Sequence, residues 1–309
     1  MPEFDVLAFG ETMGMLVAEE PGDLAEVTHF GKRIAGADSN VVIGLTRLGL
    51  RVAWLSRVGN DSLGRFIRLT LEREGVDCSR VTIDPHHPTG FQFKSREVDG
   101  RDPTVEYFRR GSAASYLSIE EDFDEQLLNV RHLHATGIPP ALSDSLRELS
   151  QHLMHSARQA GRSVSFDPNL RPSLWSSEAA MCKTINHLAS LADWVLPGLA
   201  EGRLLTGYET PEDIAAFYLD KGASAVAIKL GPEGTYFRTP NNSGHVPGYP
   251  VETVVDTVGA GDGFATGFIS ALLEGLDIPA AIARGNWIGA RAVQVIGDME
   301  GLPYRNELP

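Results

Sequence analysis

One stretch constrains this chain more than any other: the glycine-rich residues 256–263, Asp-Thr-Val-Gly-Ala-Gly-Asp-Gly. The β-branched residues 253–255 before it indicate the end of a strand. After it, Phe264, Phe268 and Leu272 recur every fourth residue, which predicts a helix. Small residues run beside them at the same spacing: Gly263, Gly267 and Ala271. One face of this helix is therefore nearly bare backbone and can lie close to a neighbouring element.

A strand, a glycine turn and the start of a helix aim free backbone N–H groups at one point, with the helix dipole behind them. Such a place suits a phosphate. Asp262 stands on the first helical turn beside it, where a carboxylate could orient or deprotonate a hydroxyl that attacks the phosphate. At this stage a structural alternative stays open, in which the glycines only make a tight turn and Asp262 caps the helix.

Composition and charge narrow the classes of partner. The 309 residues are 42% hydrophobic and 22% charged, as in a globular protein with a large core. The formal net charge of -14 argues against nucleic acid or an anionic membrane as a partner. Cys78 and Cys182 have no metal-binding spacing, the N-terminus has no signal-peptide pattern, and no apolar run reaches membrane-spanning length. We therefore expect a reduced, cytoplasmic setting.

Short buried strands alternate with helices along most of the chain. Residues 6–10, 52–58, 163–167 and 225–230 are predicted strands. Ser143 is a candidate N-cap for a helix whose apolar face contains Leu146, Leu149, Leu153 and Ala157. The alternation predicts an α/β fold with a mostly parallel central sheet flanked by helices on both faces.

Two segments break this alternation. Residues 12–35 have the pattern of a hairpin, and residues 88–110 contain two predicted strands joined by a loop with Asp99-Gly100, a hairpin signal. We expect the two segments to meet as a small sheet over the strand ends, where α/β folds bind ligands. The prediction is one domain over residues 1–309, with a β lid built from about residues 12–35 and 88–112.

The second predicted strand of the 88–110 segment carries a candidate binding face. Alternation places Val105, Tyr107 and Arg109 on the same side of it. An aromatic hydroxyl and a guanidinium would then face the same way. Because a surface hairpin can show this pairing by chance, the pattern alone assigns no site.

These features together resemble the ribokinase family, also called the phosphofructokinase-B carbohydrate kinases. Residues 256–263 resemble the second signature of that family, and the turn at residues 35–40 with its following helix resembles the first. The spacing of the signatures, the paired β segments and the order of elements agree over nearly the whole chain. The resemblance implies a ribokinase-like fold and ATP-dependent phosphorylation of a sugar hydroxyl.

The resemblance also implies roles for single residues. Gly259, Ala260 and Gly261 would cradle the transferring phosphoryl group, and Asp262 would be the catalytic base. The nucleotide would be bound by Asn169, Lys229, Gly231, Gly234 and Asn286. Mg2+ would be carried mainly by the ATP phosphates and water, with support from Glu201. A monovalent cation is a further candidate cofactor.

Within the family, four stretches look like those of 2-keto-3-deoxygluconate kinases: residues 107–113, 136–143, 167–171 and 297–301. In those enzymes the sugar acid is contacted by the positions that match Gly36, Tyr107, Arg109, Arg171 and Asp298. The two arginines could offer forked donors to the carboxylate of the sugar acid, while its primary hydroxyl lies near Asp262.

Four positions depart from the family pattern. Gly198 stands where the asparagine of an Asn-x-x-Glu motif belongs, so a metal role would rest on Glu201 alone. Gln92, an expected substrate contact, stands where some of the resembled enzymes have tyrosine, which leaves the substrate open. Thr266 is larger than the usual residue, and Asp38 replaces a common proline.

Three alternative functions remain at this stage. Fructokinases and 5-dehydro-2-deoxygluconokinases share much of the pattern, and a catalytically weak sugar- or nucleotide-binding protein is an alternative from another class. For the kinase readings the expected partner is a small-molecule sugar substrate, with no nucleic acid and no membrane. The resemblance further implies a homodimer or higher homo-oligomer that forms through the lid strands.

Overall fold

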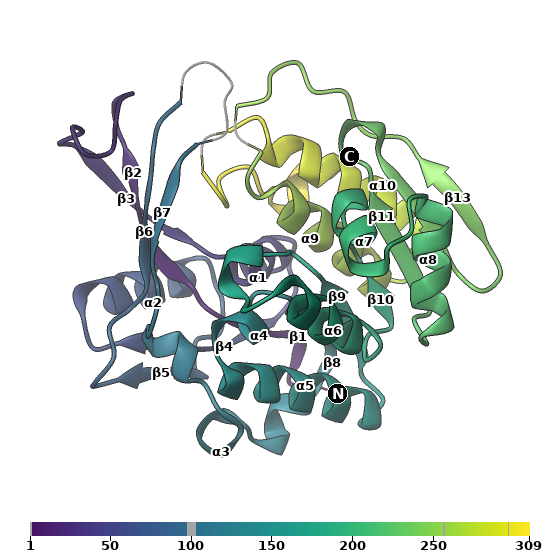
Figure 1. Cartoon of the computed structure of the whole chain (residues 1–309), viewed down its shortest axis with the longest axis horizontal. Coiled ribbons are helices and arrows are strands. Elements are labelled where there is room, and N and C mark those ends of the chain that lie inside the picture. Colours follow the sequence, from purple (N-terminus) through teal and green to yellow (C-terminus); the bar gives the residue numbers. More distant parts are fainter. Residues whose placement is uncertain (1, 98–102, 256, 296) are drawn as a thin grey trace.

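Alternating strands and helices build two sheets of different size in the computed structural model, which describes residues 2–97, 103–255, 257–295 and 297–309 (Figure 1). In the described residues the larger sheet has nine strands, in the spatial order β13 (Ser243–Val246), β12 (Thr235–Arg238), β11 (Ala225–Lys229), β10 (Trp194–Val195), β9 (Ser163–Asp167), β8 (Val130–Thr136), β1 (Phe4–Phe9), β4 (Val52–Gly59) and β5 (Val81–Asp84). This mixed α/β architecture confirms the predicted fold class.

Strand direction places the ligand-binding edge of this sheet. The strands from β11 to β5 pair in parallel, whereas β12 and β13 extend the sheet in antiparallel fashion. The parallel strands therefore end at the same edge of the sheet. In such folds that edge is where the loops after the strands gather polar groups around a ligand.

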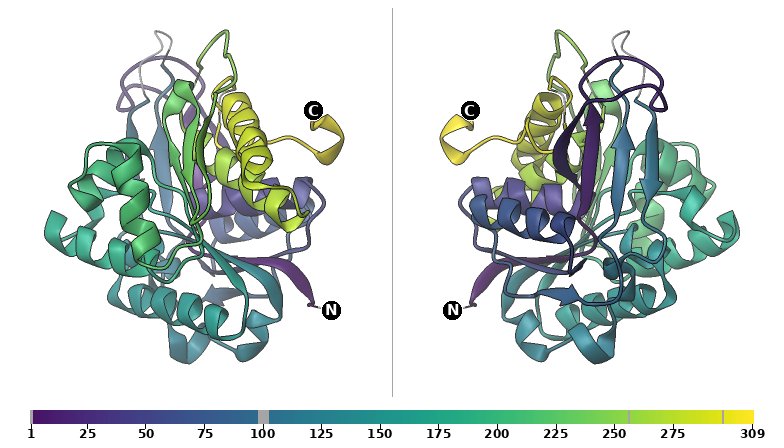
Figure 2. Two further views of the ribbon diagram at one scale, coloured as in Figure 1. Left: turned by 90° about the vertical axis from the view of Figure 1, so that its right-hand side faces the viewer. Right: turned by 90° about the vertical axis from the view of Figure 1, so that its left-hand side faces the viewer.

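Helices cover both faces of the large sheet, as seen along its edge in Figure 2. One face packs against α1 (Ala37–Arg47), α2 (Ser62–Arg73), α9 (Ala260–Leu273) and α10 (Ile278–Ala292). The other face packs against α5 (Asp144–Gln159), α6 (Glu178–Ala189), α7 (Leu199–Thr206) and α8 (Pro211–Asp220). Alternation along β1 supplies both cores, because Val6 and Ala8 face the first group of helices and Leu7 and Phe9 the second.

Short elements connect these layers. They are the helices α3 (Ile119–Asp122) and α4 (Pro139–Leu142) and 3-10 turns at Ala113–Tyr116, Glu125–Leu128, Pro172–Leu174, Gly231–Glu233 and Arg305–Glu307. Across the described ranges, no helix is both long and apolar enough to cross a membrane.

Two local predictions are confirmed. The Ser143 hydroxyl accepts a hydrogen bond from the Leu146 N–H (3.1 Å) and caps α5. The bare face of α9 lies close to α10, since a Cβ on Gly267 would stand 2.7 Å from the Gly285 Cα. Close approach of these two helices therefore depends on glycine on both sides.

The strand expected at residues 253–255 is wrong. These residues are irregular and exposed, and Val254 is 53% exposed. β-branched residues favour a strand only where a neighbouring strand completes the ladder. Here the Val255 N–H instead donates to the Val293 carbonyl (2.7 Å), which ties the segment to the end of α10.

The smaller sheet is built from the two segments that break the alternation. Its spatial order is β3 (Phe30–Ala35), β2 (Met13–Ala18), β6 (Phe91–Lys94) and β7 (Val105–Phe108). The central pair β2–β6 is parallel and the outer pairs are antiparallel. The meeting of the two segments is thus confirmed, whereas the turn predicted at Asp99-Gly100 lies outside the described residues. Arg109 follows β7 and does not belong to it.

Candidate active site

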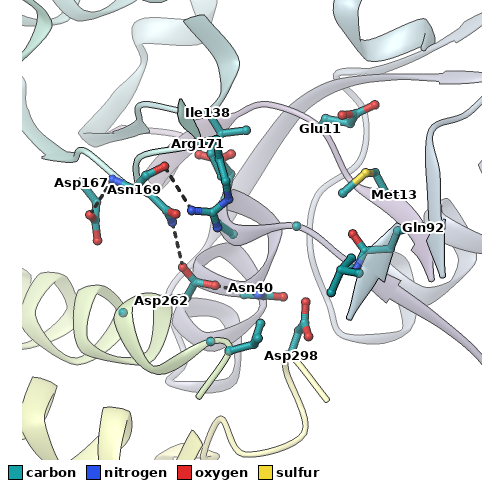
Figure 3. A pocket seen from close by; sticks show the side chains of 18 of the residues that line it. Glu11, Met13, Asn40, Gln92, Ile138, Asp167, Asn169, Arg171, Asp262 and Asp298 are labelled. Carbon is teal, nitrogen blue, oxygen red and sulfur yellow. Dashed lines mark hydrogen bonds between the residues drawn. The ribbon is translucent and has the colours of Figure 1, made fainter. Parts of the chain in front are cut away.

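Two cavities adjoin at the carboxyl edge of the parallel strands. The first, of about 380 Å³, lies between the large sheet and the small sheet, and Figure 3 shows residues that line it. The second, of about 610 Å³, lies beside α9 and α10. Lys229, Thr257 and Gly261 line both. Two ligands bound in these cavities would therefore meet at the start of α9.

The N-terminus of α9 forms the junction between the cavities. The left-handed Gly259 (φ 85°) ends the glycine turn, and a Cβ at this position would stand 2.8 Å from the Asp298 carbonyl oxygen. The first helical hydrogen bond runs from the Gly263 N–H to the Gly259 carbonyl (2.8 Å). The N–H groups of residues 260–262 thus precede the helical ladder and can bind an anion.

Asp262 is held at this junction by two asparagine side chains. The Asn40 Nδ2 donates to Asp262 Oδ2 at 2.8 Å, and the Asn169 Nδ2 donates to Oδ1 at 3.4 Å (Figure 3). Asn40 belongs to α1, whereas Asn169 follows β9 with a left-handed φ of 38°, a conformation that asparagine tolerates better than most residues. Strain of this kind concentrates at functional sites.

The surroundings of Asp262 make it a stronger base than an ordinary aspartate. Its side chain is buried, and burial raises its pKa from 3.8 to about 7. The hydrogen bond from Asn40 opposes this rise in pKa, while the charges of Asp167 and Asp298 add to it. A carboxylate with a pKa near neutrality is suited to accept a proton from a hydroxyl.

Lys229 places a positive charge at the same junction. Its Nζ lies 2.6 Å from Asp167 Oδ2. The same Nζ lies next to Gly261 on the cavity wall, 3.4 Å from where a Cβ on Gly261 would stand. Burial disfavours the charged form, but the carboxylates of Asp167 and Glu201 keep the pKa of Lys229 above its usual value. The side chain is therefore an ammonium ion at neutral pH, next to the free N–H groups of α9.

Glu201 supports the loop after β9. Its Oε1 accepts the Leu170 N–H (2.7 Å) and its Oε2 accepts the Gly198 N–H (2.8 Å). Gly198 is the N-cap residue of α7. Where the family motif has an asparagine side chain, this chain therefore offers only the main-chain N–H of Gly198, which Glu201 binds. In the described parts of the chain, no group of three or more His, Cys, Asp or Glu side chains could hold a metal ion by itself.

Charged side chains in the first cavity are arranged in ion pairs. Arg109 contacts Glu11, with Nε 2.7 Å and Nη2 2.5 Å from Oε2. Lys94 lies 3.3 Å from Asp298. Arg171 instead donates to the main-chain carbonyls of Asn169 (3.4 Å) and Leu170 (2.9 Å). Among the described contacts, Arg171 is therefore the arginine of this cavity that no carboxylate neutralises directly.

The predicted sugar contacts come together in this first cavity. All six line it: Gly36, Gln92, Tyr107, Arg109, Arg171 and Asp298. Gln92 is buried and donates to the Met15 sulfur (3.3 Å), and the Arg109 guanidinium lies 6.0 Å from the centre of the Tyr107 ring. Tyr107 and Arg109 thus line one cavity, in keeping with the side that alternation gave them.

The predicted nucleotide contacts divide between the cavities. Gly231, Gly234 and Asn286 line the second, Asn169 lines the first, and Lys229 lines both. Glu201, the residue expected to support Mg2+, lines the first. Gly234 (φ 100°) has no room for a side chain, because a Cβ would stand 2.4 Å from the Gly248 N. The Asn286 amide already holds the protein together, since it accepts from the Thr235 hydroxyl (2.7 Å) and donates to the Pro247 carbonyl (3.1 Å).

A nucleotide fits the second cavity. Its wall is largely apolar and includes Val251, Val254, Phe264 and Val293, which suits a flat purine base. This lining role explains why Val254 is exposed. The N–H groups at the start of α9 and the ammonium of Lys229 suit the phosphates at the other end.

Sequence reasoning missed several residues of the site. Glu11, Asn40 and Lys94 line the first cavity but were not assigned to it. Sequence signals were available for two of them. Glu11 directly follows the predicted strand 6–10, and Lys94 stands two residues beyond Gln92, on the same face of β6.

The chain is similar to known proteins over nearly its whole length. The family model described as "pfkB family carbohydrate kinase" matches residues 3–305. The 2-dehydro-3-deoxygluconokinase of Bacillus subtilis is 54% identical over 99% of this chain and 94% of its own length. The enzyme of the same name from Thermoproteus tenax is 35% identical over 98% of this chain and 92% of its own.

Solved structures with the same fold include a PfkB protein from Polaromonas sp. It superposes with a TM-score of 0.92 at 54% identity, and the match covers 98% of each chain. An Escherichia coli protein, provisionally assigned as a ribokinase II and solved with ATP and Mg2+, has a TM-score of 0.90 at 29% identity over 98% of this chain and 97% of its own.

The raised pKa of Asp262 predicts a pH-dependent stability. Folding raises this pKa from 3.8 to about 7, so ionisation of Asp262 costs stability as the pH rises through that window. Asp262→Asn removes this cost. The variant should be more stable than wild type at pH 8, by up to about 4 kcal/mol, and the difference should vanish near pH 4. Urea unfolding from pH 4 to pH 8 measures it.

Asp144→Asn is the matched control, because the Asp144 side chain is 89% exposed on α5. Its stability relative to wild type should change little over the same range of pH. An Asp262→Asn effect that is constant with pH would show that Asp262 ionises as an ordinary aspartate.

Proposed function

The chain belongs to the pfkB family of carbohydrate kinases, and on this premise we propose that it transfers the γ-phosphoryl group of ATP to a sugar acid, 2-keto-3-deoxygluconate. Membership of the family makes the protein a phosphotransferase that acts on a sugar hydroxyl. The acceptor would be the primary hydroxyl, which gives the 6-phosphate. The identity of the B. subtilis relative supports this choice of sugar.

One observation carries the proposal: the two cavities share Lys229, Thr257 and Gly261, with Asp262 beside the shared wall. Phosphoryl transfer needs an attacking hydroxyl and a phosphate in line, and the catalyst mainly positions them and stabilises charge. The sugar would bind in the first cavity and ATP in the second. Their reacting groups would then meet at the start of α9.

The chain's own residues would divide the chemistry. Asp262 accepts the proton of the sugar hydroxyl as that oxygen attacks, while Asn40 and Asn169 hold the carboxylate in place. The N–H groups of residues 260–262 and the Lys229 ammonium bind the transferring phosphoryl group. Mg2+ bound with ATP would neutralise phosphate charge, and Glu201 is the side chain we assign to its support.

Arg171 would be the main ligand of the sugar carboxylate. Its guanidinium is not paired with a carboxylate in the described contacts, whereas Arg109 is already held by Glu11. A guanidinium can donate two parallel hydrogen bonds to a carboxylate. Arg109 would contribute donors to the same substrate from the side of the small sheet.

Turnover assays test the function directly. ADP release from MgATP should be fast with 2-keto-3-deoxygluconate and slow with fructose, ribose or 5-dehydro-2-deoxygluconate. Asp262→Asn should lower kcat roughly 100- to 10,000-fold, because it removes the base, and should change KM little. A preference for fructose would replace the proposed sugar, and an Asp262→Asn variant with normal kcat would refute the base. If no sugar gives ADP release although the ligands still bind, a catalytically weak binding protein would be favoured.

Arg171→Ala separates recognition of the carboxylate from general binding. Loss of this charge-assisted contact should raise KM for the sugar acid roughly 10- to 100-fold, while any neutral sugar that serves as a slow substrate is little affected. Steady-state kinetics on both sugars measure the difference. Arg203→Ala, outside both cavities, is the control. An equal rise in KM for the acidic and the neutral sugar would refute the assignment of Arg171 to the carboxylate.

Two further assignments belong to this proposal. We place the protein in the cytoplasm, in keeping with the unpaired Cys78 and Cys182. We also assign a homodimer that forms through the small sheet, which acts as the lid. The outer face of that sheet carries a group of contacting aromatic rings: Phe30, Phe91, Phe93 and Phe108.

This aromatic face would be covered by a second copy of the chain. Phe108 is 49% exposed and stacks on the half-buried Phe91 (4.8 Å between ring centres), so apolar rings lie side by side on this face of the sheet. Contiguous apolar surface of this kind marks interaction sites. Wild type should therefore have twice the 33.5 kDa mass of one chain in light scattering.

Phe108→Asp should shift that mass to a monomer, because it buries a charge in the proposed interface. Tyr208→Ser is the control, since it removes a similarly exposed aromatic residue after α7. A wild-type monomer at micromolar concentration, or a Phe108→Asp dimer, would refute this interface.

A further inference from the structure

One buried carboxyl of the sugar cavity has no part in the mechanism above. Asp38 stands in the first turn of α1 and is 1% exposed. It lines the same cavity as Arg109 and Asp262. Its Oδ1 has no hydrogen-bond partner in the described structure. The Thr136 side chain hydrogen-bonds to the Asp38 carboxyl. A ligand in the cavity that donates to Oδ1 would remove the cost of leaving that oxygen unpaired.

The backbone around Asp38 makes room for this carboxyl. Gly10 follows β1 with a positive φ of 151°, and a Cβ there would stand 2.7 Å from Asp38 Oδ2 and 3.2 Å from the Pro139 side chain. Any larger residue at position 10 would push the carboxyl away. The carboxyl thus lies between the C-terminal end of β1 and the N-terminal end of α4.

Two neighbouring residues repeat the same feature. Glu11 Oε1 and Asn40 Oδ1 are also buried without a partner among the described atoms, and both residues line the cavity. Three unpartnered acceptors on one cavity wall suit a ligand that carries several hydroxyl donors. A sugar acid is such a ligand, and its hydroxyls would satisfy the buried oxygens.

Asp38 lies within electrostatic reach of both ends of the proposed substrate. The charges of Asp262 and Arg109 both act on its carboxyl, and burial beside Asp262 raises its pKa from 3.8 to about 7. In the proposed function Asp262 would hold the terminal hydroxyl, and Arg109 would donate to the substrate from the side of the small sheet. A chain that spans the two would therefore pass its middle hydroxyls over Asp38.

We propose that Asp38 is a specificity residue that accepts a hydrogen bond from the 4-hydroxyl of the sugar acid and thereby selects the configuration at that carbon. The inference rests on the proposed function. By this contact Asp38 would distinguish 2-keto-3-deoxygluconate from 2-keto-3-deoxygalactonate, because the two acids differ only in the configuration at carbon 4. A site built to bind a hydroxyl discriminates strongly against a ligand that cannot present it, because its buried acceptor is then left unpaired.

The test measures kcat and KM for both epimers in wild type, Asp38→Ala and Asp38→Asn. Wild type should prefer one epimer. Asp38→Ala should lower kcat/KM for that epimer roughly 10- to 100-fold and for the other less than about 3-fold, so that the preference collapses. Asp38→Asn keeps the shape of the side chain and a weaker hydrogen-bond acceptor. It should therefore lower the ratio of kcat/KM between the two epimers about 3- to 10-fold. KM for ATP should not move.

Asp144→Asn, an aspartate in the first turn of α5, is the matched control and should keep the wild-type preference. A wild type that uses both epimers equally, or Asp38 variants that lose the same factor on both, would overturn the inference. If Asp38→Ala fails to fold, Asp38→Asn decides alone. A wild type that phosphorylates neither acid would instead refute the proposed function, so the two failures are told apart.

Discussion

The hydrogen bond between Asn40 and Asp262 ties together the two helices on which the site depends. Its partners lie 222 residues apart, in the first turns of α1 and α9. The helices can approach because Gly44 has no side chain, since a Cβ there would stand 2.7 Å from the Thr266 Cγ2. This contact explains how the fold accommodates a residue larger than the family norm at position 266. The position of Asp262 is therefore set by packing over two helices.

Charge is distributed unequally between the small sheet and the body of the protein. In the described structure, the ion pairs between them put the cation on the segments of the small sheet and the carboxylate on the body: Arg33 with Glu300, Lys94 with Asp298, and Arg109 with Glu11. The pairs of Lys94 and Arg109 are buried, and removing one partner of a buried pair is strongly destabilising. The basic side chains of the small sheet thus lie against carboxylates of the body of the protein. In this way a protein with a net charge of -14 still presents basic groups to an anionic sugar.

Much of the architecture was predictable because it depends on short-range patterns. Alternating apolar residues indicated the strands, Ser143 marked the start of α5, and the spacing of Gly263 and Gly267 indicated a face that packs closely. The strand predicted at residues 253–255 failed for a nonlocal reason. β-branched residues form a strand only beside another strand, and here the chain lines a cavity instead.

The sequence by itself determined the fold class, the glycine turn proposed to bind the phosphoryl group and the choice of Asp262 as the candidate base, since each follows from residues close together in the chain. Only the tertiary structure decided that Glu11 pairs with Arg109. It also decided that, among the residues whose placement is described, Arg171 has no such carboxylate and the buried Asp38 has one oxygen without a partner. Pairing, burial and the resulting pKa values depend on distances between segments far apart in the chain, and no local pattern encodes those distances.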